Sequence, residues 1–368
     1  MRIRRFAKFG RMSVKYRDNQ VSRLFSDIAA LIADGVGDKE ALSSQLNELT
    51  ASNSPEVADY WRRTNRGMGV PDVAFRGRSP YLFPEEAPAR TFRTSGTSGQ
   101  ERGEAHYSAR GMELMDLSIV TNARRNVVRG LERPIILRFV PPEALAPEMV
   151  MAHGMELIAR TFGHPELSAC LVSPSGVDFP LLLSRLDTAV SHGIPVVLIG
   201  GSFAYVNVCD ALEGMGRSWE LPKGSRMIDA GGFKGRSRVV GVDALRSMVG
   251  RTFGIASSEC TNLFGMTELA SQLYDAADVA VGPIGERPKG STSFVQPRVR
   301  DSLDLSLRTE GKGLLEVADL CILDRPHVVL TGDRGVARPE GVAITGRIER
   351  GQSRGCSLTL DAMTGGAS

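Results

Sequence analysis

Lysine and cysteine are both scarce in this chain of 368 residues. Seven lysines stand among 45 basic residues, so arginine supplies nearly all of the positive charge. The net charge of +3 is too close to balance, and too evenly spread, for a nucleic-acid-binding surface. The five cysteines are odd in number and irregularly spaced, which fits neither a disulfide framework nor paired zinc-binding knuckles. We therefore expect a cytoplasmic protein that binds no nucleic acid.

Long apolar runs are missing as well. The longest, such as residues 194–199, have the length of a strand, whereas a membrane-spanning helix needs roughly 20 apolar residues. Residues 1–20 are basic, but Asp27 interrupts the apolar stretch that follows, so the core of a signal peptide is lacking. We predict no membrane span and a solvated basic arm at residues 1–20, with a transit peptide as the alternative.

Apolar residues at helical spacing begin the chain, and an alternating pattern follows. Residues 21–33 and 39–49 predict two helices that a turn at Asp34-Gly35 joins. From about Thr91, short β-rich runs alternate with helical segments, which indicates layered α/β structure with a largely parallel sheet. The predicted strands are 135–140, 170–172, 195–199, 227–229, 313–317 and 328–330, and the predicted helices are 109–125, 147–162 and 179–192. A loop near 282–297 precedes a final β-rich section that runs to Arg347.

The strongest local feature is a loop rich in hydroxyl groups and glycine before a predicted helix. Its residues are Thr94, Ser95, Gly96, Thr97, Ser98 and Gly99. Glycines let backbone N–H groups approach an anion closely, and hydroxyls add donors, so such a loop can wrap phosphates. It is not a Walker A loop, because no Gly-Lys-Ser/Thr follows at the required spacing. A flexible surface turn is the alternative interpretation.

Three further segments carry chemistry-bearing residues. The glycine-rich run 229–235 follows a predicted strand and either places bare backbone against a flat ring or forms an ordinary turn. Residues 264–268 bring together an aromatic ring, a hydroxyl and a carboxylate, enough to stack a base, donate to a phosphate and hold a metal. A buried Phe264 and a capping Thr267 are the alternative there. Asp333 follows the predicted strand 328–330, and strand ends are where α/β folds bind ligands, although a turn residue fits equally.

In this order the four segments resemble the motif series of the acyl-adenylate-forming superfamily, which includes acyl-CoA synthetases, luciferases and peptide-synthetase adenylation domains. The resemblance spans about Thr91 to Arg354, and residues 346–349 with 354–355 are similar to the superfamily's hinge motif. Within it, residues 231–238, 264–269 and 354–359 look most like the LuxE-type acyl-protein synthetases of bacterial luminescence. The resemblance implies an adenylate-forming domain of layered α/β subdomains at 21–345 and a hinge-like tail at 346–368.

The resemblance also implies an ATP site with Mg²⁺. Its cofactor-binding residues would be Thr94, Ser95, Gly96, Thr97, Ser98, Gly99, Gly231, Gly232, Phe233, Phe264, Gly265, Met266, Asp333 and Arg347. The hydroxyl-rich loop would hold the β- and γ-phosphates, and the glycines with Phe264 would enclose adenine. Thr267 would donate to the α-phosphate and Glu268 would bind Mg²⁺, while Asp333 and Arg347 would approach the ribose.

This chain departs from the superfamily at three places. Glu101-Arg102 stands where the phosphate loop usually closes with Pro-Lys, so a guanidinium fork replaces a point charge. Glu349 occupies a hinge position that is commonly Asp. The superfamily's catalytic lysine lies in a small mobile domain beyond the hinge, and we expect this chain to lack that domain. Lys234 is either its substitute in a proposed nucleotide-binding loop or a surface residue.

Cys356 lies in the Arg-Gly-Cys-Ser segment just after the hinge-like motif. In LuxE-type enzymes the cysteine of this segment accepts the acyl group as a thioester, and Arg354 would favour the attacking thiolate. An inert packing cysteine is the alternative, and it is our interpretation of the other four, which are Cys170, Cys209, Cys260 and Cys321.

The resemblance therefore implies an ATP-dependent ligase that forms an acyl-AMP and pyrophosphate. Catalysis would rest on Thr267, Glu268, Lys234 and Cys356, with the acyl group passing from Cys356 to a partner protein, a reductase or carrier protein. Two alternatives stay open: a ligase that loads coenzyme A or a carrier's phosphopantetheine directly, and a catalytically weak nucleotide-binding scaffold subunit. A long-chain fatty acid follows from the resemblance as the carboxylic acid substrate, with aromatic or amino acids as alternatives.

Overall fold

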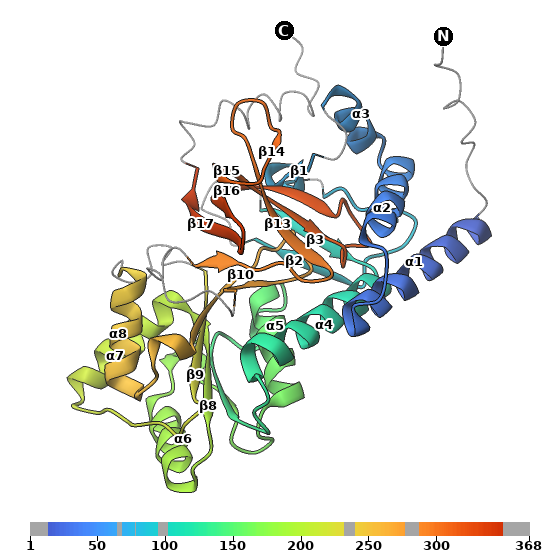
Figure 1. Ribbon diagram of the computed structural model, residues 1–368. Coiled ribbons are helices and arrows are strands. Elements are labelled where there is room, and N and C mark those ends of the chain that lie inside the picture. The colour runs from blue at the N-terminus through green and yellow to red at the C-terminus, as the bar shows by residue number, and fades with distance from the viewer. Residues whose placement is uncertain are drawn as a thin grey trace, which may run out of the picture.

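The computed structural model describes residues 14–64, 68–77, 79–94, 102–231, 240–276 and 287–348. Three helices begin this part of the chain: α1 (Val14–Asp34), α2 (Lys39–Asn53) and α3 (Pro55–Arg63) (Figure 1). Leu24, Ile28 and Leu31 recur at helical spacing in α1 and are all buried, which explains the helix. Residues 14–20, which the sequence assigned to the basic arm, belong to α1, because the helix starts earlier than its apolar face predicts.

A parallel sheet forms the centre of one half of the molecule. Its strands are β4 (Ile135–Phe139), β5 (Ala169–Cys170), β8 (Val196–Gly201), β9 (Arg226–Ala230), β10 (Cys260–Phe264) and β11 (Leu273–Tyr274). Their order is β11-β10-β9-β8-β4-β5, with β11 alone antiparallel to its neighbour. The prediction of α/β layers with a largely parallel sheet is confirmed.

Helices cover both faces of this sheet (Figure 1). They are α4 (Ala109–Ala123) and α5 (Val150–Phe162) on one face, and α6 (Phe179–His192), α7 (Ser202–Gly214) and α8 (Val242–Phe253) on the other. Alternate strand residues enter different cores: Ile136 packs in the core that holds α4 and α5, and Leu137 in the core that holds α6, α7 and α8. Continuous apolar runs such as β4 therefore mark strands that are buried on both faces.

An antiparallel sheet forms the other half. Its strands are β12 (Pro288–Lys289), β13 (Val295–Arg300), β14 (Leu307–Arg308), β15 (Gly311–Asp319), β16 (Val328–Arg338) and β17 (Gly341–Arg347), and β1 (Val70–Pro71) pairs with β16 in parallel. The β-rich final section is thereby confirmed, but two of its predicted strands are too short. β16 continues through Asp333, so the prediction that Asp333 lies at a strand end is wrong. Asp333 pairs with Arg347 of β17, and Thr331 Oγ1 donates to Leu315 O of β15 at 3.0 Å at the place where the register of β15 and β16 shifts.

Short elements complete the described chain. They are the hairpins β2 (Arg90–Arg93) with β3 (Glu104–Tyr107) and β6 (Val172–Ser173) with β7 (Gly176–Val177), the 3₁₀ turns η1 (Asp72–Phe75), η3 (Glu143–Leu145) and η4 (Ser257–Glu259), and the π-helical turn η2 (Arg124–Val128). The predicted strand 170–172 is divided between β5 and β6, and the predicted helix 147–162 begins at Val150. Among the described residues, no helix is both long enough and apolar enough to cross a bilayer.

Candidate active site

The β2–β3 hairpin carries the hydroxyl-rich loop. Thr94 N donates to Gly103 O at 2.8 Å, and Gly103 N donates to Thr94 Oγ1 at 2.8 Å. These two bonds fasten the ends of the loop together where it leaves the hairpin. The remaining predicted phosphate-binding residues, Ser95, Gly96, Thr97, Ser98 and Gly99, lie outside the described residues.

A cavity of about 410 Å³ lies beside this hairpin, lined by Gly77, Arg93, Arg102 and Glu104. Arg102 donates from Nε to Thr94 O at 2.7 Å and from Nη1 to Glu148 Oε2 at 2.9 Å. Glu148 also pairs with Arg93, whose hydrogen bond lowers the pKa of the Glu148 carboxyl. Arg102 uses its guanidinium as a fork, which a lysine ammonium in this place would not do.

Glu268 lies in the segment between β10 and β11 and is 6% exposed. The pKa of its carboxyl is raised to about 7, chiefly by burial and in smaller part by the charge of Asp72. A hydrogen bond to its own backbone and the charges of Arg325 and Arg347 act in the opposite direction. A methyl group added at Gly103 would lie 3.3 Å from Glu268 Oε1 and 3.0 Å from Thr94 Cγ2. The candidate metal carboxylate therefore meets the stem of the hydroxyl-rich loop at a glycine, where a larger residue would crowd both.

Asp333 and Arg347 face each other across β16 and β17, as register partners. Arg347 Nε donates to Asp333 Oδ1 at 3.3 Å, while Asp333 Oδ2 is buried and accepts no hydrogen bond from the described residues. Burial raises the pKa of Asp333 and Arg347 lowers it. A buried acceptor oxygen beside an exposed guanidinium suits a ligand that brings hydroxyl donors.

Asp72, on η1, is a candidate site residue that the sequence did not reveal. Its carboxylate accepts from Gly332 N at 3.3 Å, and its charge raises the pKa of both Glu268 and Asp333. Asp72 therefore lies within electrostatic range of both carboxylates, although the three residues come from distant parts of the chain. No motif surrounds Asp72, so only the fold identifies it.

Gly231 and Phe264 lie at the carboxyl edge of the parallel sheet. Ala230 pairs with Leu263 in the register of β9 and β10, so Gly231 and Phe264 come next along their strands. Gly231 has φ +73°, a conformation that favours glycine. In the segment that follows, Thr267 is buried, Met266 is half-buried and Gly265 is exposed. Gly232, Phe233 and Lys234 fall outside the part of the chain that the structure describes.

A buried polar network lies beneath this edge. Asp229 Oδ2 accepts from Ser202 Oγ and from Asn262 Nδ2, both at 2.8 Å. Lys289 Nζ donates to Asn262 Oδ1 at 2.7 Å and to Asp275 Oδ1 at 2.8 Å, which joins β12 to β10. Lys289 is 3% exposed, so its role in the described structure is to fix these two sheets at their junction.

The family model described as "Acyl-protein synthetase, LuxE" matches residues 92–364. The chain belongs to this family. The match begins on β2, just before Thr94, and extends beyond Cys356, so it includes every residue proposed for the site except Asp72. The resemblance read from the motifs is confirmed, and the family is one of adenylate-forming ligases. No curated protein sequence matches the chain.

Solved structures share the fold of this LuxE-family chain. A long-chain-fatty-acid–CoA ligase from Archaeoglobus fulgidus is similar over 72% of this chain and 52% of its own, at 14% identity and a TM-score of 0.51. The N-terminal domain of FACL13 from Mycobacterium tuberculosis is similar over 74% of this chain and 64% of its own, at 16% identity and a TM-score of 0.48. The LuxE-family chain thus spans about half the length of the ligase that it resembles, and that likeness concerns the fold.

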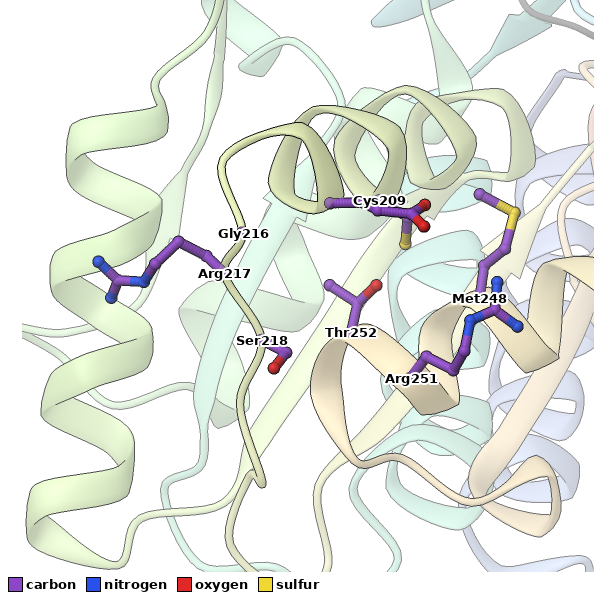
Figure 2. A pocket seen from close by; sticks show the side chains of 8 residues that line it. Cys209, Gly216, Arg217, Ser218, Met248, Arg251 and Thr252 are labelled. Carbon is purple, nitrogen blue, oxygen red and sulfur yellow. The ribbon is translucent and has the colours of Figure 1, made fainter.

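A second cavity, of about 230 Å³, lies between α7 and α8 (Figure 2). Cys209, Met248 and Thr252 line it, and burial raises the pKa of the Cys209 thiol to about 11. Such a thiol stays protonated near pH 7, so it is a packing residue and a poor nucleophile. The described cysteines, Cys170, Cys209, Cys260 and Cys321, are all free, whereas Cys356 lies outside the described residues.

The described residues hold no group of three or more His, Cys, Asp or Glu side chains arranged to bind a metal ion. Magnesium needs no such group, because it is usually bound by one or two carboxylates together with substrate phosphates and water. Glu268 suits that role, since a cation would offset the unfavourable burial that raises its pKa.

Proposed function

We propose that this LuxE-family chain activates a carboxylic acid with ATP. A carboxylate oxygen of the acid attacks the α-phosphorus, the bond from that phosphorus to the bridging oxygen breaks, and pyrophosphate leaves with the bonding electrons. The products are an acyl-AMP and pyrophosphate. Thr267 donates to the α-phosphate, and fixed donors and charges stabilise the charge that develops there.

The observation that carries this proposal is the meeting of three motifs in one place. Glu268 Oε1 lies beside Gly103 of the stem, 3.3 Å from where a Cβ would stand, and the charge of Asp72 raises the pKa of both Glu268 and Asp333. A nucleotide that spans this place would put its phosphates at the hydroxyl-rich loop and its ribose at Asp333 and Arg347. Phe264, with Gly231, supports an adenine slot at the sheet edge.

We propose Mg²⁺ as the metal and Glu268 as the residue that holds it. When bound, the ion supplies positive charge to the phosphates. The 6% exposure of Glu268 and its pKa of about 7 support this role, because a buried carboxylate is stabilised by a cation.

The second step moves the acyl group to a thiol. The Cys356 thiolate attacks the carbonyl carbon of the acyl-AMP, a thioester forms, and AMP leaves with the bonding electrons. A partner protein then takes the acyl group. We propose a long-chain fatty acid as the substrate, which rests on membership of the LuxE family.

Pyrophosphate exchange into ATP across a panel of carboxylic acids tests the first step. We expect exchange with at least one acid, and long-chain fatty acids are the first to try. Folded protein that binds ATP but exchanges with no acid would contradict the proposal and favour a nucleotide-binding scaffold. Direct formation of acyl-coenzyme A without an acylated enzyme would contradict the second step alone.

Asp333→Asn is expected to raise the KM for ATP about tenfold with a smaller change in kcat. The amide keeps the shape, but it replaces a carboxylate acceptor of ribose hydroxyls, and a hydrogen bond to a charged group contributes about 1.5–3 kcal/mol. Steady-state exchange rates at varied ATP measure the change. Asp304→Asn, in the exposed turn between β13 and β14, is the control. An unchanged KM in Asp333→Asn would remove this residue from the ribose site.

A further inference from the structure

The segment that carries Glu268 has no regular secondary structure between β10 and β11. Side chains from β3, α4 and β15 hold its backbone by hydrogen bonds. Tyr107 OH donates to Leu269 O at 3.0 Å, Ser118 Oγ donates to Ala270 O at 3.1 Å, and Asn122 Nδ2 donates to Gln272 O at 3.2 Å. Asp319 Oδ2 accepts from Ala270 N at 2.9 Å and from Ser271 N at 2.7 Å. The segment is therefore fixed by its surroundings and not by its own conformational preference.

Arg325 is the point at which this set of bonds joins Glu268 to the phosphate-loop hairpin. Its Nε donates to Glu268 O at 3.2 Å, its Nη1 to His106 O at 3.4 Å and its Nη2 to Tyr107 OH at 2.6 Å. The guanidinium carbon lies 4.1 Å from the centre of the Tyr107 ring. The Arg325 side chain thus joins β3, the strand that follows the hydroxyl-rich loop, to Glu268.

Burying the Arg325 guanidinium costs desolvation free energy unless hydrogen bonds or nearby charges offset it. The side chain is 1% exposed, and an isolated buried charge is strongly disfavoured. The Arg325 guanidinium donates to two backbone carbonyls and one hydroxyl. Its charge lowers the pKa of Glu268, although Arg325 forms no ion pair with the Glu268 carboxylate. The carboxylate consequently stays available to another cation.

We propose that Arg325 is the positioning residue for Glu268: it holds the Glu268 backbone against the β2–β3 hairpin, so that the carboxylate lies at the Thr94–Gly103 stem and is available to the divalent cation of a bound nucleotide. The inference rests on the proposed function of Glu268. Only a planar fork reaches these three acceptors at once, so lysine is not an equivalent replacement. Partners that orient a metal ligand typically change metal affinity or activity by about 10–100-fold when they are removed.

The test compares Arg325→Lys with Arg300→Lys. Arg300, on β13, is also buried and contacts Glu316 with Nε at 2.6 Å and Nη2 at 3.1 Å, so its replacement measures the general effect of losing a buried guanidinium. Binding of Mn²⁺ in the presence of ATP is followed by electron paramagnetic resonance, and pyrophosphate exchange is followed in parallel. We expect Arg325→Lys to raise the half-saturating Mn²⁺ concentration about tenfold or more and to lower kcat by a similar factor. Arg300→Lys should lower the Tm but change neither quantity.

Tyr107→Phe provides a second, milder probe. It removes the hydroxyl that accepts from Arg325 and donates to Leu269 O, and should shift Mn²⁺ binding in the same direction by about threefold. Folded Arg325→Lys with wild-type Mn²⁺ binding and wild-type kcat would overturn the inference. If Arg325→Lys does not fold, unchanged Mn²⁺ binding in Tyr107→Phe overturns it. Absence of exchange in the wild type would count against the proposed function, whereas the Mn²⁺ measurement would still decide the role of Arg325.

Discussion

Glu268→Gln is expected to lower the rate of pyrophosphate exchange about 100-fold, which corresponds to about 2.7 kcal/mol of lost transition-state stabilisation. The amide fills the same space but is a far weaker ligand for a divalent cation than a carboxylate. Exchange assays at saturating ATP and acid, repeated over a range of Mg²⁺ concentrations, measure the loss. Glu340→Gln, in the exposed turn before β17, is the matched control and should behave as wild type.

The same substitution should stabilise the free protein. The folded pKa of Glu268 is about 7 against an ordinary value of 4.5, so ionisation of this buried acid opposes folding above pH 4.5. The cost grows as the pH rises to about 7 and then stays constant at about 3 kcal/mol. Glu268→Gln should therefore raise the Tm at pH 8 and leave it almost unchanged at pH 4. Equal activity in Glu268→Gln and wild type would contradict the metal-binding role, whatever the Tm does.

Cys356→Ala is expected to abolish the covalent acyl-enzyme while leaving pyrophosphate exchange within about twofold of wild type. Acyl-AMP formation needs no thiol, whereas the thioester needs the thiolate as its nucleophile. Intact mass after incubation with ATP and the acid reveals the adduct, and exchange measured on the same sample reports the first step.

Cys170→Ala is the control for this experiment. Cys170 is free and half-buried on β5, so its removal tests whether this partly exposed cysteine collects the acyl group instead of Cys356. The adduct should persist in Cys170→Ala. If it persists in Cys356→Ala as well, the acceptor is another residue, and loading of a carrier without any adduct would point to direct transfer.

Helices were predictable where a capping residue precedes the first turn and a glycine follows the last turn. α6 begins and ends as predicted, because Asp178 caps its first turn, with its side chain accepting from Leu181 N, and Gly193 closes it at φ +68°. β16 was predicted too short because Thr331-Gly332-Asp333 has the composition of a turn. The neighbouring strands override this local preference, because Arg347 of β17 pairs with Asp333 and Leu315 O of β15 accepts from Thr331 Oγ1. Neither neighbour can be recognised from the Thr-Gly-Asp sequence alone.

The candidate site likewise has some features that the sequence predicts and others that only the tertiary structure reveals. The order of the four motifs and the LuxE resemblance follow from the sequence, since each motif needs only residues that are close in the chain. Only the tertiary structure decided that Glu268 lies beside Gly103. It also decided the influence of Asp72 on Glu268 and the bonds from Arg325 to Glu268 and His106. The physical reason is that these groups act through distances of a few ångströms between elements far apart in the chain, and only the packing of the two sheets and their helices sets those distances.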